Sequence, residues 1–163
     1  MGLQLPGELV TVLGYIGLDW PEADEEKLFE LGETWLQLAG GLRGTAQQAD
    51  TVASRVWQDN SGEAISAFQR YWSEHSPGDA LGLSGDAALV LGGGLIVYAA
   101  IVLGLKINVI VQLVILAIQI AQAIATAGPT FGASLLEIPV FRQITRAVVE
   151  SLIWEVIGAI IGG

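Results

Sequence analysis

A run of fifty residues, 87–136, contains one charged side chain, that of Lys106. The 86 residues before this run carry fourteen acidic and four basic side chains. With its glycines counted, the chain is about 65% apolar, whereas a typical soluble domain is about 45–50% apolar. A domain of ~150 residues buries only ~68–70% of its unfolded surface. The apolar excess therefore predicts that the second half of the chain contacts its own neighbours, another subunit or lipid.

The charge balance excludes one class of partner and leaves few groups for chemistry. The net charge is −10, and all of it lies within residues 1–86. Because no basic stripe is present to displace counterions from phosphates, we expect no binding to nucleic acid. The chain has no cysteine, and its one histidine, His75, has no second nitrogen or sulfur ligand near it in the sequence. We therefore expect no enzymatic activity, no metal and no cofactor.

The acidic half shows the clearest helical periodicity in the chain. Residues 8–17 predict a short helix ending at Gly17, and Pro21 and Glu22 favour the start of a longer helix that reaches Trp57. Between residues 28 and 56 the apolar positions of this longer helix alternate spacings of three and four. Such a heptad pattern predicts a seam against another long helix. The leading residues of the seam are Leu28, Leu31, Trp35, Leu38 and Leu42.

A turn is predicted at residues 59–62, Asp-Asn-Ser-Gly, followed by a second helix that Ser76-Pro77-Gly78 interrupts. Helices joined by a short turn are antiparallel neighbours. Residues 1–78 thus predict an acidic N-terminal segment and a helical hairpin.

Residues 79–163 predict further apolar helices, over 79–105 with a bend at Gly92-Gly93-Gly94, over 107–127, and over 140–161. No strand pattern appears. The predicted fold class is all-α, a long antiparallel hairpin extended by two to three apolar helices into a bundle. This second region would pack on the hairpin, on other subunits or in a membrane.

The residues around the turn follow a known spacing: Gly62, Ala64, Phe68 and Trp72, with Asn60 two positions before the glycine. This pattern resembles the WXG100 superfamily, in which a Trp-x-Gly turn joins two antiparallel helices and Asn60 would occupy the place of the Trp. With the opening segments at residues 5–9 and 19–25, the chain looks like the WXG100-like N-terminal domains of actinobacterial polymorphic toxins.

The resemblance implies a trafficking and interaction domain for type VII secretion, exported to the cell surface or beyond. Its partners would be a second copy of the chain or a small WXG100-type helical protein, and a C-terminal toxin domain would follow in the full-length protein. Type VII substrates of this kind carry a Tyr-x-x-x-Asp/Glu element after the second helix. Here Tyr71 is followed at that spacing by His75. Export would then depend on a partner that supplies the element, or would not occur.

The predicted helix over 107–127 carries a polar stripe on an otherwise apolar cylinder. At 100° per residue its hydrogen-bonding side chains fall within an arc of ~80° and span about 27 Å, close to the ~30 Å thickness of a bilayer core. These residues are Asn108, Gln112, Gln119, Gln122 and Thr126. Two environments remain open. The helix could lie inside a protein bundle, or it could lie in lipid with the stripe facing other helices or a pore lumen. The second reading makes the chain a membrane-inserting, pore-forming or channel module.

Overall fold

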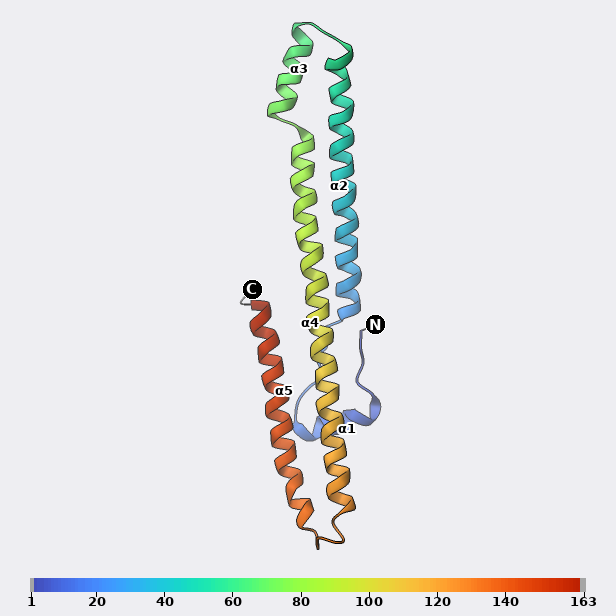
Figure 1. Cartoon of the computed structure of the whole chain (residues 1–163), viewed down its shortest axis with the longest axis vertical. Coiled ribbons are helices and arrows are strands. Elements are labelled where there is room, and N and C mark those ends of the chain that lie inside the picture. The colour runs from blue at the N-terminus through green and yellow to red at the C-terminus, as the bar shows by residue number, and fades with distance from the viewer. Residues whose placement is uncertain (1, 162–163) are drawn as a thin grey trace. The chain divides into compact units, whose positions relative to one another are not determined.

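The structure, a computed structural model, describes residues 2–161 of the chain. Within this range the elements follow the order α1 (Gly7–Ile16), α2 (Glu25–Asp59), α3 (Glu63–Glu74), α4 (Pro77–Ala125), the 3-10 helix η1 (Ala133–Glu137) and α5 (Ile138–Ile161) (Figure 1). No strand occurs among these residues. The all-α class predicted from the sequence is confirmed.

The chain divides into two compact units. One unit comprises residues 28–97 and holds the hairpin, and the other comprises residues 1–27 and 98–163. The sequence places the boundary at residues 78 and 79 instead. The division of the structure differs because the N-terminal residues pack with the C-terminal half of α4 and with α5.

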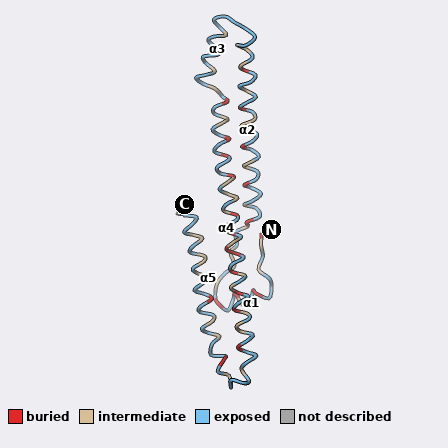
Figure 2. Tube along the Cα trace, in the orientation of Figure 1, coloured by how far each residue is buried: buried red, intermediate tan, exposed pale blue. Residues whose placement is uncertain are grey.

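Within the unit of residues 28–97, α2 leads through an exposed turn into α3, and α3 and α4 return alongside α2 (Figure 1). Figure 2 shows separate buried positions along α2. From residue 28 onward, these buried positions recur every seven residues and are all small. They are Gly32, Ala39, Ala46 and Ala53. The facing part of α4 buries Gly78, Gly85 and Gly92, again seven residues apart. Small residues at a repeating position allow two helices to approach closely.

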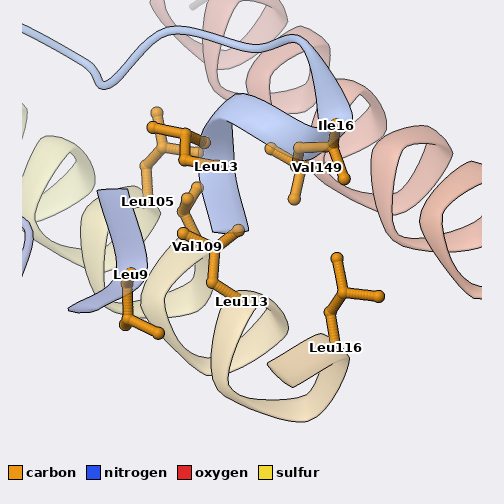
Figure 3. Packing of buried hydrophobic residues seen from close by; sticks show 8 residues of the cluster. All are labelled: Leu9, Leu13, Ile16, Leu105, Val109, Leu113, Leu116 and Val149. Carbon is orange, nitrogen blue, oxygen red and sulfur yellow. The ribbon is translucent and has the colours of Figure 1, made fainter. Parts of the chain in front are cut away.

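Within the other unit, three helices share one apolar core. Leu9, Leu13 and Ile16 of α1 pack with α4 and with Val149 of α5. The α4 members of the core are Leu105, Val109, Leu113 and Leu116. Figure 3 shows Ile16 beside Val149, and Leu13 beside Leu105 and Val109. The α1 helix therefore crosses the surface that α4 and α5 present together.

Local signals explain where several helices begin and end. Gly17 ends α1 in the left-handed conformation, with φ of 68°. Asp24 caps α2, since its Oδ1 accepts a hydrogen bond of 3.1 Å from the Lys27 amide. That hydrogen bond holds the pKa of the Asp24 carboxyl below its ordinary value of 3.8. The helix consequently begins at Glu25, three residues later than the sequence predicts.

The predicted bend at Gly92-Gly93-Gly94 is wrong, because α4 continues unbroken from Pro77 to Ala125. Gly92 is a contact point for α2, as its Cβ would lie 2.8 Å from the Gly32 carbonyl oxygen. Lys106 also lies inside this one helix, where the sequence predicts a boundary between two helices. Tertiary packing of α4 thus outweighs the low helix propensity of its glycines.

Candidate functional site

The predicted turn residues are placed at the tip of the hairpin, and only part of the set forms contacts. Gly62 has a φ of 126°, which favours glycine, and Ala64 is exposed. Phe68 and Trp72 are half-buried and lie 5.9 Å apart between ring centroids. Asn60 donates a hydrogen bond of 2.9 Å from Nδ2 to the Val56 carbonyl. This bond closes the end of α2.

Trp57 makes the aromatic contact between the two hairpin helices near the turn. Its ring centroid lies 5.9 Å from that of Phe68, at an interplanar angle of 48°. Such tilted geometry is favourable for aromatic pairs. The sequence shows Trp57 three residues before Asn60, but it does not show which of the two positions would face α3. The tertiary structure assigns the contact to Trp57.

Asp50 ties α2 to the segment between α3 and α4. Its Oδ1 accepts hydrogen bonds from Trp72 Nε1 at 3.0 Å and from Ser76 Oγ at 3.3 Å. The first residues of α4 lie beside it, since a Cβ on Gly78 would be 2.7 Å from Asp50 Oδ1. A carboxylate at a helix N-terminus is stabilised by the helix dipole. Asp50 therefore fixes the position where the chain begins α4 at Pro77.

The predicted seam of α2 does not coincide with the face that packs inside the hairpin. Leu31 and Leu38 are 47% and 46% exposed. Leu28, Trp35 and Leu42 are half-buried. The buried face lies one residue further along, at the small positions, because only small side chains fit where the two backbones approach. The seam thus keeps a free apolar edge, which Val52 extends at 63% exposure.

The heptad pattern of the sequence does not include these small residues, because it is defined by bulky apolar positions. The signal was present in the sequence as two sets of Gly and Ala at seven-residue spacing, one in α2 and one in α4. The α4 set, which is all glycine, indicates by itself only low helix propensity, and the α2 set, which is mostly alanine, indicates only good helix-forming positions. Their meaning appears only when both helices are placed against each other.

Four residues of the polar stripe lie on α4 and Thr126 directly follows its end, and the side chains of the stripe make no hydrogen bond to another helix within residues 2–161. Asn108 donates 3.0 Å from Nδ2 to the carbonyl of Gly104, in its own helix. Thr126 likewise donates to the carbonyl of Gln122, at 2.9 Å. Gln112 and Gln119 are half-buried, whereas Gln122 is exposed. A role in binding helices or lining a passage stays a prediction.

The C-terminal part of α4 presents three different arcs around its circumference. At 100° per residue, the core residues of α4 occupy one arc, and the polar stripe lies next to it. A third arc, roughly opposite the core, is apolar and between 39% and 52% exposed. It consists of Leu103, Ile107, Val111, Val114 and Ile118. Among the described residues, one helical stretch, Glu63–Ala125, is long and apolar enough to cross a membrane by composition. One such stretch is weak support for a membrane span.

The single charge of the apolar run is buried and paired. Lys106 is 2% exposed, and its Nζ lies 2.7 Å from Oε2 of Glu25 and 2.6 Å from the carbonyl oxygen of Ala23. Glu25 is 7% exposed and also accepts a hydrogen bond from the Leu3 amide. The Lys106 ammonium lies 5.9 Å from the centroid of the Trp20 ring, within range of a cation–π interaction. Lys106 of α4 thus binds residues that follow α1, and Glu25 connects them to Leu3, which precedes α1.

Opposing effects act on the Glu25 carboxyl. Burial disfavours its charged form, but the hydrogen bonds from Lys106 and the Leu3 amide outweigh burial, so its pKa lies below the ordinary value of 4.5. A lone charge within an apolar run predicts a buried partner, because unpaired buried charges are strongly unfavourable. The sequence offers fourteen acidic candidates before the run. Only the structure identifies Glu25.

No metal-binding group of three or more His, Cys, Asp or Glu side chains occurs in the part of the chain that is described. The surface offers shallow hollows, the one beside Lys106 having a volume of about 200 Å³.

Comparison with known proteins identifies one family. The family model described as a WXG100 like domain matches residues 6–148. No curated protein and no solved structure matches the chain. The match covers both hairpin helices, all of α4 and the start of α5. The chain therefore belongs to the WXG100-like family, a helical family related to type VII secretion.

Proposed function

We propose that the chain is the non-catalytic trafficking and interaction domain of a type VII secretion toxin, and that α2 binds another helix. Family membership supports the link to type VII secretion. The observation that carries the proposal is the free apolar edge of α2. The full-length protein would continue into a C-terminal toxin and would be secreted or held at the cell surface.

The free edge has the geometry that a helical partner requires. Leu31, Leu38 and Val52 share one heptad position, with Thr45 between them, and all four are exposed. A heptad stripe on one helix packs against a matching stripe on another. Because Gly32 and the alanines already fill the hairpin contact, this stripe is available to a second copy of the chain or to a small WXG100-type protein.

The C-terminal end of α3 supports dependence on a partner for export. Tyr71 is 62% exposed, and its ring stacks on His75 at 4.9 Å between centroids. An acidic side chain at position 75 would complete the element of type VII substrates, but the residue is histidine. A partner that carries the complete element would supply the signal in a complex.

The test is a double variant, Leu31→Asp/Leu38→Asp, with Gln37→Asp/Gln48→Asp as the control that adds the same charge at exposed polar positions of α2. Size-exclusion chromatography with light scattering measures the mass of the assembly, and circular dichroism measures helicity. We expect the leucine variant to lose assembly while it keeps its helicity, because these leucines are half-exposed in the single chain. Equal assembly of both variants would refute the α2 interface.

A second candidate function is membrane insertion by α4 and α5. The supporting observation is the exposed apolar arc of α4, which spans about 22 Å between residues 103 and 118. The polar stripe would then form hydrogen bonds between neighbouring helices or line a pore. Dye leakage from phosphatidylcholine vesicles, lost in a Gln112→Leu/Gln119→Leu variant, would support this function. Absence of leakage at every protein concentration would exclude it.

A further inference from the structure

Residues 2–24, here called the strap, cover the inner face of α4 and α5. Leu9, Leu13 and Ile16 of the strap are between 3% and 9% exposed, and they pack on α4 residues that are equally buried. Leu113 and Leu116 on the covered side are 0% exposed. The strap and α5 together remove this face of α4 from water, and the strap covers the part that contacts Leu9, Leu13 and Ile16.

Two polar clasps hold the strap: one joins its two ends to α4, and the other binds the C-terminal end of α1. Near its C-terminal end, the carbonyl of Ala23 and the adjacent Glu25 carboxylate bind Lys106 of α4. The N-terminal end joins the same clasp through the Leu3 amide. Gly2 passes so close that a Cβ there would lie 2.6 Å from Glu25 Oε2. A substitution at residue 2 would therefore disturb the carboxylate.

The second clasp binds the C-terminal end of α1. Arg142 of α5 donates from Nε to the Tyr15 carbonyl at 2.9 Å, and from Nη2 to the same oxygen. Its guanidinium also lies 5.5 Å from the centroid of the Tyr15 ring. A cation at the last carbonyls of a helix is favourable because the helix dipole is negative there. This clasp is exposed, whereas the Lys106 clasp is buried.

Release of the strap would change the character of α4. The apolar arc of α4 that lies roughly opposite its core residues is already exposed. Release of the strap would expose the core residues Leu105, Val109 and Leu113 as well. Between residues 107 and 125 no charged side chain would remain on either arc. An uncharged helix of this length with a single narrow polar stripe meets the requirements of a bilayer span.

We propose that the strap is an autoinhibitory cover, locked by the buried Glu25–Lys106 pair, and that its release allows α4 and α5 to enter a lipid bilayer. The inference rests on the second candidate function, membrane insertion, and adds the element that controls it. When one partner of a buried ion pair is lost, the other charge stays buried without compensation, which is strongly unfavourable. Loss of the Glu25 charge would therefore favour opening of the clasp, because opening exposes Lys106 to water.

The test compares Glu25→Gln with Glu22→Gln, which makes the same change at an exposed carboxylate of the strap. Hydrogen exchange followed by mass spectrometry measures opening of residues 2–20 in the full chain. Co-flotation with phosphatidylcholine vesicles measures lipid binding. We expect Glu25→Gln to raise hydrogen exchange of the strap by roughly two to three orders of magnitude and to raise vesicle binding in parallel. Exchange in the hairpin of residues 28–97 should stay unchanged, and Glu22→Gln should behave as the unmodified chain.

Arg142→Gln provides a second, milder opening, because it removes an exposed clasp and leaves the Glu25–Lys106 pair intact. It should raise strap exchange and vesicle binding by a smaller factor than Glu25→Gln. Unchanged hydrogen exchange of the strap in Glu25→Gln, or exchange raised throughout the chain, would refute the claim that the Glu25–Lys106 pair holds the strap in place. Equal vesicle binding with the strap closed and open would refute the claim that the strap prevents lipid binding. Absence of vesicle binding by every variant, with the strap shown to be open, would refute the membrane function itself.

Discussion

Gly92 of α4 lies so close to α2 that replacement by alanine leaves no room for the added methyl group. A Cβ at this position would be 2.8 Å from the Gly32 carbonyl oxygen and 3.0 Å from Leu36 Cδ2. Comfortable contacts between carbon atoms lie at about 3.5–4.0 Å. Since one of the two obstacles is backbone, the helices must separate rather than one side chain move aside.

The magnitude follows from two opposing contributions. Overpacking of a well-packed contact costs about 1–3 kcal/mol. Replacing a helical glycine by alanine returns about 1 kcal/mol through helix propensity. Gly92→Ala should therefore change the free energy of unfolding by about 0 to 2 kcal/mol toward instability. Gly94→Ala receives only the propensity gain and should stabilise by roughly 0.5–1 kcal/mol, because Gly94 is exposed and nothing lies within 4 Å of its Cβ position.

Thermal unfolding followed by far-ultraviolet circular dichroism measures the difference between the two variants. A change of 1 kcal/mol shifts Tm by about 2–4 °C in a chain of this size. Gly94→Ala should unfold above the unmodified chain and Gly92→Ala at or below it. Gly32→Ala, on the opposite helix, should repeat the cost, since its Cβ would be 2.7 Å from Ile96 Cγ1. Equal stabilisation by Gly92→Ala and Gly94→Ala would refute the close packing of α2 and α4.

Three further predictions concern single side chains. The Glu25 carboxylate, whose folded-state pKa lies below 4.5, should contribute stability above that pH and lose it as the pH falls through the folded-state pKa. In Glu25→Gln the free energy of unfolding should therefore depend less on pH. The variant should also lose about 3–5 kcal/mol of stability at neutral pH, because the Lys106 charge is left without its partner. Ser134→Ala should cost about 1 kcal/mol in urea unfolding, as the buried hydroxyl donates 2.7 Å to a carbonyl of α4. Trp72→Phe keeps the aromatic contact but loses the hydrogen bond to Asp50, and a loss of about 1 kcal/mol is expected. If Trp72→Phe has the same free energy of unfolding as the unmodified chain, the hydrogen bond to Asp50 makes no net contribution to stability.

The sequence by itself determines the class of fold and much of its local structure. The alternation of three and four in α2 predicts a long helix, and the Asp-Asn-Ser-Gly segment predicts the turn after it. Both are local properties, because they depend on side chains within a few residues of each other. Gly17 as the end of α1 belongs to the same class of signal. The charge-free run likewise predicts a face that must be covered, without indicating which segment covers it.

Only the tertiary structure decides which faces meet. The glycines of α4 read locally as a bend, but against the small residues of α2 they become the place where two backbones touch. Glu25 and Lys106 are 81 residues apart, and no local pattern distinguishes Glu25 from its acidic neighbours. The physical reason is the same in both cases. Close packing and buried charge pairing depend on two distant surfaces at once, so neither partner carries the information alone.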